Sequence, residues 1–186
     1  MRQNSTDRGH VMILRKSPID TPLGPMLALA SDAALCALEF SSKGRMTRLT
    51  SRLDRFFAPY QIERGSNAVI DRARTWLDQY FTGAAADPND LPLDMRGAQF
   101  ERRVWRALLD IPAGETSTYG AIAKQLGSAA ASRAVGLANG ANPVAIIVPC
   151  HRVIGSNGTL TGYGGGLDRK RWLLDHERRW ARGRLF

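Results

Sequence analysis

Apolar residues near the start of the chain fall into three short runs separated by turn residues. The runs cover residues 11–14, 26–30 and 34–40, and Thr21-Pro22-Leu23-Gly24-Pro25 lies between the first two. Short apolar runs bounded by proline and glycine are typical of strands joined by tight turns. We therefore predict a small three-stranded antiparallel sheet, with Cys36 packed in its core.

Apolar residues at three- and four-residue steps predict four longer helices, at 45–57, 68–81, 98–109 and 168–180. The segment 84–97 begins with small and polar residues and a proline, which indicates a linker. The predicted fold class is α+β. Its predicted parts are a disordered tail at 1–10, a small α/β domain at 11–83, the linker, a mostly helical domain at 98–180 and a tail at 181–186.

Two short helices with a tight turn between them are predicted in the second half. Thr116, Ser117 and Thr118 are N-cap candidates for a helix at 119–126, Gly127 closes it, and a second helix follows at 130–138. This spacing is that of a helix-turn-helix DNA-binding unit, so we expect the C-terminal domain to be winged-helix-like.

The second of these helices consists mainly of alanine and glycine around Arg133. Sequence reading in the major groove needs polar side chains aimed at base edges, whereas a smooth helix binds DNA through phosphates and shape. We therefore predict DNA binding with little sequence preference, in which Arg133 fills the gap left by an extruded nucleotide. Small residues also permit tight helix packing, and this alternative stays open.

The charge of the chain agrees with a polyanionic partner. A formal net charge of +9 favours nucleic acid, although simple solubility would also explain it. No apolar stretch approaches the roughly 20 residues of a membrane span, and the polar N-terminus lacks a signal-peptide core. We expect a soluble, cytoplasmic protein without a membrane partner, in which Cys36 and Cys150 are free thiols.

The candidate chemistry lies at the end of a strongly apolar run. Residues 144–148 predict a buried strand that Pro149 ends, and Cys150 follows directly. The neighbours His151 and Arg152 are expected to lower the pKa of the thiol and make it a nucleophile. The alternative is an inert buried cysteine, which is the commoner case for an isolated Cys-His pair.

Two later residues fit a site around this thiol. Tyr163 is the only large side chain in the glycine-rich stretch 161–166, and a planar ring among glycines suits contact with a flat base. Glu177 falls between Leu173 and Leu174 on the helical wheel, so it needs a buried partner, for which His151 is the natural candidate. A core-packed tyrosine and a surface salt bridge are the alternatives.

Together these motifs resemble one known family. Pro149-Cys150-His151-Arg152-Val153, preceded by Asn142-Pro143 and followed by Thr161-Gly162-Tyr163 and Leu173-Leu174-Asp175-His176-Glu177, is similar to the O6-alkylguanine-DNA alkyltransferases. The resemblance covers roughly residues 100–177. It implies that Cys150 irreversibly accepts the alkyl group of a flipped guanine, that His151 acts as its base through a water, and that Glu177 holds His151.

The resemblance implies further roles and a partner. Arg133 would fill the base stack from the minor groove, Tyr119 would lie beside the flipped nucleotide, and Asn142 would support the active-site turn. Tyr163, Gly164 and Val153 would line the substrate pocket. The small residues there predict a roomy pocket that tolerates large alkyl groups. We expect double-stranded DNA containing alkylated guanine as the partner, and a monomer without cofactor or metal.

Two other classes of function remain open. A cysteine hydrolase would also use Cys150 and His151, but it would turn over many times, whereas an alkyltransferase stops after one equivalent. A DNA-binding protein that senses lesions without repairing them would share the architecture. Such a protein has no need of the thiol that this chain carries.

Overall fold

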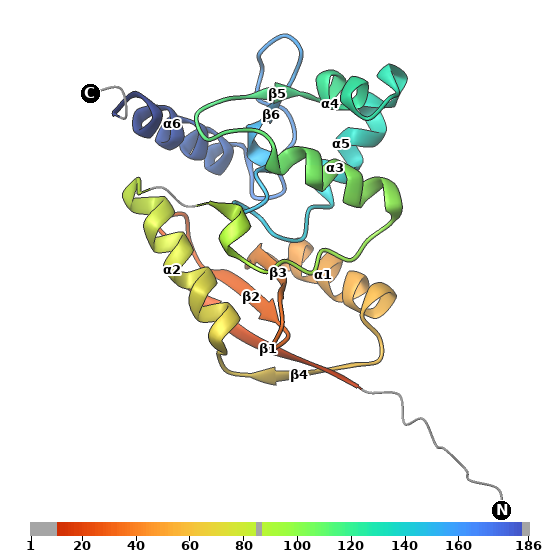
Figure 1. The fold of residues 1–186 in the computed structure, drawn as a ribbon, viewed down its shortest axis with the longest axis vertical. Helices are drawn as coiled ribbons and strands as arrows, with labels where there is room; N and C mark the ends of the chain where they lie inside the picture. Colours follow the sequence, from red (N-terminus) through yellow and green to blue (C-terminus); the bar gives the residue numbers. More distant parts are fainter. Residues whose placement is uncertain (1–10, 85–86, 184–186) are drawn as a thin grey trace, which may run out of the picture.

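The structure is a computed structural model that describes residues 11–84 and 87–183. Its N-terminal half contains a four-stranded sheet in the order β3-β2-β1-β4 (Figure 1). The strands are β1 (Met12–Ile19), β2 (Met26–Ala30), β3 (Leu35–Phe40) and β4 (Tyr60–Arg64). The first three pair antiparallel, as the sequence predicts, and β4 adds to the edge of the sheet parallel to β1.

The strand β4 was not predicted because its composition is polar. Only Ile62 is aliphatic among its residues, and Ile62 remains 40% exposed at the sheet edge. Its place comes from pairing with β1, including an ion pair between Arg15 and Glu63 at 2.5 Å. An edge strand with charged residues discourages pairing with other chains, which agrees with this composition.

Helices cover both faces of the sheet. Helix α1 (Lys43–Phe56) places Leu49 and Leu53 in a cluster with Leu14, Leu29 and Cys36. Helix α2 (Ala68–Thr82) packs on the other face, and its buried residues join a second, larger cluster. Cys36 therefore lies in the core, as expected, and both cysteines are free.

The C-terminal half is mostly helical, so the predicted α+β fold class is confirmed. It contains α3 (Gln99–Leu109), α4 (Tyr119–Gln125), α5 (Ser132–Gly140) and α6 (Leu167–Gly183). A short parallel pair, β5 (Ser117–Thr118) and β6 (Val153–Ile154), and the 3-10 turns η1 (Pro88–Asp90), η2 (Ala129–Ala131) and η3 (Cys150–Arg152) complete it. The helices agree with the predicted ranges apart from a few residues at their ends.

The predicted linker and C-terminal tail differ in part from the structure. The Leu35 N–H of β3 donates to the Pro92 carbonyl, and the Leu35 carbonyl accepts from the Asp94 N–H. The predicted linker therefore packs against the sheet. Helix α6 continues to Gly183, past the expected end at residue 180, and Ala181 lies close to Gly114. The predictions for residues 1–10, 85–86 and 184–186 lie outside the described residues.

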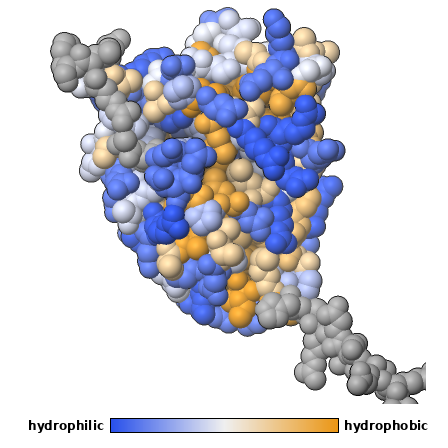
Figure 2. All heavy atoms as spheres, viewed as in Figure 1, coloured by the Kyte–Doolittle hydropathy of each residue, from blue (hydrophilic) through white to orange (hydrophobic). Residues whose placement is uncertain are grey.

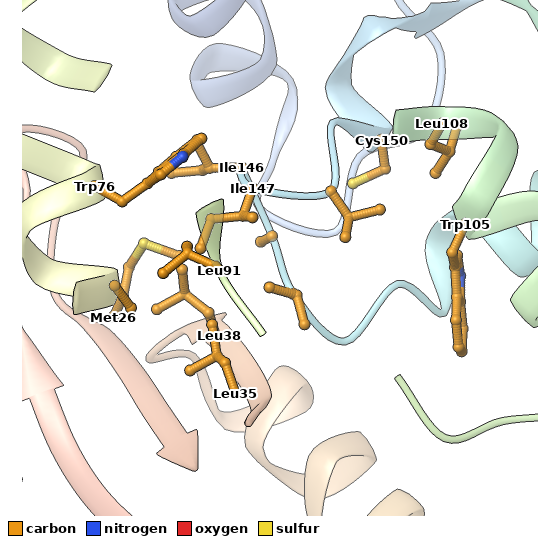
Figure 3. Close-up of a cluster of buried hydrophobic side chains, with 14 of the residues drawn as sticks. Met26, Leu35, Leu38, Trp76, Leu91, Trp105, Leu108, Ile146, Ile147 and Cys150 are labelled. Carbon is orange, nitrogen blue, oxygen red and sulfur yellow. The ribbon is translucent and has the colours of Figure 1, made fainter. Parts of the chain in front are cut away.

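One hydrophobic cluster joins the two halves. It runs from Met26 and Trp76 in the N-terminal half to Trp105 and Cys150 in the C-terminal half. Figure 3 shows Cys150 beside Leu108 at one side of this cluster. Figure 2 shows hydrophilic residues over most of one face, with apolar residues visible between them. No helix within the described part of the chain is long and apolar enough to cross a membrane.

The caps of α1 and α2 give a test of the fold. Asn67 caps α2, since its side-chain oxygen accepts from the Ile70 N–H at 3.0 Å and its amide donates to the Ser31 carbonyl. Asn67→Ala should lower the free energy of unfolding by about 1–2 kcal/mol, measured by urea denaturation. Ser42 caps α1 without a side-chain hydrogen bond, so Ser42→Ala is the matched control and should change little. Equal losses in both variants would contradict this assignment.

Candidate active site

The apolar run before Cys150 forms a buried turn, so the predicted strand is wrong. Val144 makes an isolated bridge to Leu38 of β3, and the chain then turns so that the Val148 N–H reaches the Val144 carbonyl at 3.0 Å. Ile146 has φ of 72°, which is a strained conformation for a β-branched residue. The run looks like a strand because all of its side chains are buried, yet β3 supplies only one bridge.

Asn142 holds this turn together. Its amide nitrogen donates to the Val148 carbonyl at 2.8 Å, and its side-chain oxygen accepts from the Val144 N–H at 3.0 Å. These bonds satisfy backbone groups that a strand would have paired with a neighbour. The turn then delivers Cys150 at the first residue of η3.

Cys150 is buried, and burial raises the pKa of its thiol to about 11, although a hydrogen bond from Asn142 opposes the rise. The expected lowering of this pKa by His151 and Arg152 is wrong for this conformation. Both of those side chains bind Glu177 instead. The thiol is therefore protonated at neutral pH.

Glu177 of α6 is the centre of a buried charged cluster. Its Oε1 lies 2.7 Å from His151 Nε2, and Arg152 donates to both carboxylate oxygens, at 2.9 and 3.0 Å. Burial by itself would raise the pKa of Glu177, but His151 and Arg152 together hold this pKa well below its usual range. The carboxylate is therefore ionised.

An ionised Glu177 fixes the tautomer of His151. Because the carboxylate only accepts hydrogen bonds, His151 Nε2 must carry the proton that it shares with Oε1. Burial lowers the pKa of His151, which Glu177 partly offsets, so the ring is neutral. Its Nδ1 is buried and has no hydrogen-bond partner among the described residues. Nδ1 is thus a base with a free lone pair, one residue from the thiol.

The cavity beside Cys150 is nearly closed. It has a volume of about 10 Å³, and its wall includes Tyr163, Gly164, Asn139 and Arg45. The predicted roomy pocket is therefore wrong for this conformation, since the space would hold no more than about one water. The Tyr163 hydroxyl and Asn139 Oδ1 are buried there without a hydrogen-bond partner among the described residues. Unsatisfied buried polar groups are costly and commonly mark a ligand site.

Arg45 of α1 closes this cavity and had no signal in the sequence. It forms an ion pair with the buried Glu39, and its guanidinium donates to the carbonyls of Gly140 and Asn142 at 3.0 and 3.2 Å. A side chain at Gly164 would collide with this guanidinium. Glu39 is close to Arg45 in sequence, but Gly140 and Asn142 are 95 and 97 residues away, so no local pattern could have placed Arg45 at this cavity.

Lys170 of α6 is a second residue that the sequence analysis missed. It is fully buried, and its ammonium donates to the carbonyls of Val153 and Thr161 at 2.6 and 2.7 Å. Burial lowers its pKa to about 8. Lys170 lies seven residues before Glu177, on the same face of the helix, so the helical wheel that drew attention to Glu177 could have found it.

The helix-turn-helix forms a concave surface. Tyr119, Arg133, Gly136 and Leu137 line an open depression of about 560 Å³. Arg133 is exposed, as predicted, but the surface is not smooth, because Leu137 lies one turn further along α5 and is 73% exposed. The Tyr119 hydroxyl donates to the Thr161 carbonyl at 3.2 Å, which connects this surface to the loop that carries Tyr163.

The structure thus brings together most of the predicted site residues but not all. Cys150, Tyr163 and Gly164 share one cavity, and His151 and Glu177 share one buried pair. Val153 is fully buried in β6, and the cavity beside Cys150 is lined by other residues. No cluster of three or more metal-ligating side chains occurs in residues 11–84 and 87–183.

The fold and the site define a class of protein with a helix-turn-helix domain and a buried cysteine beside a histidine–glutamate pair. Residues 99–179 match the family described as 6-O-methylguanine DNA methyltransferase, DNA binding domain, and residues 14–95 match the ribonuclease-like domain of 6-O-methylguanine DNA methyltransferase. The chain therefore belongs to this family, and the resemblance found in its motifs is confirmed.

Individual relatives agree over most of the chain. A methylated-DNA–protein-cysteine methyltransferase of Mycolicibacterium paratuberculosis is 64% identical over 162 residues, which span 87% of this chain and 90% of that protein. Its counterpart in Shigella flexneri is 43% identical over 165 residues, with 88% and 95% covered. The structure of Mycobacterium tuberculosis OGT in complex with DNA has a TM-score of 0.73 at 44% identity, covering 90% of this chain and 94% of that one.

The pKa of the thiol gives a test of the site. In a Cys36→Ala variant, the rate at which a small alkylating reagent modifies Cys150 should rise about tenfold per pH unit from pH 7 to 10, because the thiolate fraction keeps growing towards a pKa of about 11. The urea-unfolded protein is the control and should reach a plateau just above pH 9. A plateau near pH 8 in the folded protein would contradict this assignment, because it would show that cationic neighbours lower the pKa of the Cys150 thiol more than burial raises it.

Proposed function

We propose that this protein repairs DNA by direct reversal, transferring the alkyl group from the O6 atom of guanine to Cys150. The observation that carries this proposal is a buried thiol one residue from a neutral histidine. The hydrogen bond from His151 Nε2 to Glu177 fixes the orientation of the ring, and Nδ1 has no hydrogen-bond partner among the described residues. A neutral imidazole held in one tautomer is suited to take a proton from a neighbouring thiol.

The chemistry balances without a cofactor. The proton of the Cys150 thiol passes through a bridging water to His151 Nδ1, and the sulfur then bonds to the alkyl carbon as the carbon–O6 bond breaks. The electron pair of that bond stays on the guanine, which recovers the proton from His151. Glu177 stabilises the transient imidazolium. A thioether remains on Cys150, so each protein molecule reacts once.

Access to the thiol requires the guanine to leave the duplex and the cavity to open. A purine ring is far larger than the present space beside Cys150, so Tyr163 and Arg45 must withdraw when the base enters. The Tyr163 hydroxyl and Asn139 Oδ1, which have no hydrogen-bond partner within residues 11–84 and 87–183, are then available to the edge of the base. The backbone N–H of Gly164 is also expected to face it.

The helix-turn-helix is the proposed DNA-binding surface. Arg133 would occupy the stack in place of the flipped guanine, and the exposed Leu137 would add an apolar contact in the minor groove beside it. Tyr119, which bonds to the active-site loop, would face the flipped nucleotide. We place the protein in the cytoplasm, where it would act on DNA as a monomer.

Mass spectrometry of the intact protein tests the proposed function. After incubation with a duplex that contains O6-methylguanine, the mass should increase by one methyl group, and peptide mapping should locate that group on Cys150. Cys150→Ser is the matched variant and should show no increase, because its hydroxyl is a much weaker nucleophile.

The same experiment separates the rival functions. A cysteine hydrolase would cycle and release product beyond one equivalent, and a lesion-sensing protein would bind the duplex with no change in mass. Either result would defeat the proposal.

Replacement of Arg133 tests base flipping. Arg133→Ala should lower the rate of transfer from duplex DNA by about tenfold or more, because the flipped state loses the side chain that fills its gap. Reaction with free O6-methylguanine, which needs no flipping, should stay unchanged. Arg171→Ala removes an equally charged, exposed side chain on α6 and should affect neither substrate. Equal losses on duplex and free base would contradict the role of Arg133.

A further inference from the structure

Tyr80 of α2 reaches across from the N-terminal half to the charged cluster of the active site. Its ring is buried, and its hydroxyl donates a hydrogen bond to Glu177 Oε1 at 2.7 Å. The same oxygen lies 2.7 Å from His151 Nε2. The phenol and the imidazole therefore share one carboxylate oxygen, although they come from opposite halves of the chain.

The ring of Tyr80 is held from several sides. It stacks on Trp76 with ring centroids 5.4 Å apart and an angle of 10° between the planes, and Phe81 meets it edge-on at the same separation. The His176 ring lies 5.4 Å away, and His176 Nε2 is 2.7 Å from the Tyr80 carbonyl oxygen. The position of the hydroxyl is thus fixed by packing, which is how a positioning residue is usually held.

The hydroxyl stays a neutral donor. Burial raises the pKa of Tyr80 well above its ordinary value, and the charge of Glu177 raises it further. A donor at Oε1 disperses part of the carboxylate charge, and this weakens the attraction of that oxygen for an imidazolium. Tyr80 therefore reduces the extent to which Glu177 can raise the pKa of His151.

Arg152 also contacts the oxygen that Tyr80 binds. Its Nη2 donates to Oε1 at 3.0 Å and its Nε to Oε2 at 2.9 Å, whereas the Gly114 N–H donates to Oε2 at 3.2 Å. Lys170 and Arg152 lower the pKa of His151 by their charge, and the Tyr163 ring meets the imidazole edge-on at 6.4 Å. Among these described groups, only Tyr80 brings the N-terminal half to the carboxylate.

We propose that Tyr80 is a positioning residue for alkyl transfer, which acts through Glu177 and keeps His151 neutral at physiological pH. This assigns a function to the N-terminal half, beyond completing the core. The proposal rests on the proposed transfer to Cys150, because His151 is the base in that reaction.

The test is the pH dependence of single-turnover transfer from duplex O6-methylguanine, measured from pH 5 to 9. Protonation of His151 removes the base, so the rate falls on the acidic side. In Tyr80→Phe, Oε1 of Glu177 loses the hydrogen bond from the phenol, so the carboxylate should attract the imidazolium more strongly and raise the pKa of His151. The acidic limb of the rate profile should then move to higher pH by about one unit. Phe81→Leu is the matched control, because Phe81 packs on Tyr80 without contacting Glu177, and its limb should stay in place.

Nuclear magnetic resonance provides a readout that needs no reaction. The chain has three histidines, so ¹⁵N-labelled histidine gives few signals, and His151 should show the tautomer with the proton on Nε2. In Tyr80→Phe, the midpoint of the His151 titration should rise by the same amount as the acidic limb of the transfer rate. If wild type gains no methyl group, the proposed function fails, while this titration still tests the action of Tyr80 on His151.

A second variant covers the case in which Tyr80→Phe does not fold. Fluorotyrosine at position 80 keeps the ring and strengthens the donor, so the limb and the titration midpoint should move to lower pH. The proposal is overturned if the folded variants titrate like wild type. It is also overturned if Phe81→Leu shifts the limb as much as Tyr80→Phe.

Discussion

The active site depends on keeping a fully buried carboxylate charged. Glu177 and His151 are both completely inaccessible, and a lone carboxylate in such a place would take up a proton. Arg152 supplies the compensating charge with two hydrogen bonds, and Tyr80 and the Gly114 N–H complete the shell. Because breaking a buried ion pair costs about 3–5 kcal/mol, this cluster also binds α6, α2 and η3 together.

The thiol is stored in an unreactive state. Burial keeps Cys150 protonated, and Arg45 and Tyr163 leave almost no space beside it. Such an arrangement protects a cysteine that can be used only once from oxidation and from unintended alkylation, since the thiolate is the reactive form. This arrangement leaves the Tyr163 hydroxyl and His151 Nδ1 buried without a hydrogen-bond partner in the part of the chain that the structure describes. A base that entered the site could satisfy them.

Short contacts connect the helix-turn-helix surface to the loop and strand around Cys150. Tyr119, at the start of α4, bonds to the Thr161 carbonyl, and the same carbonyl accepts from Lys170 on α6. Lys170 also holds Val153, one residue after η3. If DNA binding moves the loop that contains Thr161, these hydrogen bonds would transmit the movement to β6, the strand that follows Cys150.

The sequence by itself determined the elements whose signals are local. Periodicity located α2 and α6, turn residues separated β1 from β2, and the position of Glu177 on a helical wheel indicated a buried partner. The tertiary structure decided what depends on distant residues. Residues 144–148 form a turn because Asn142 and Leu38 satisfy their backbone, and β4 exists because β1 pairs with it. The pKa of the Cys150 thiol rises because the folded chain buries it, while His151 and Arg152 face Glu177 instead of the sulfur. Burial and charge pairing act between segments far apart in the chain, so no local pattern contains them.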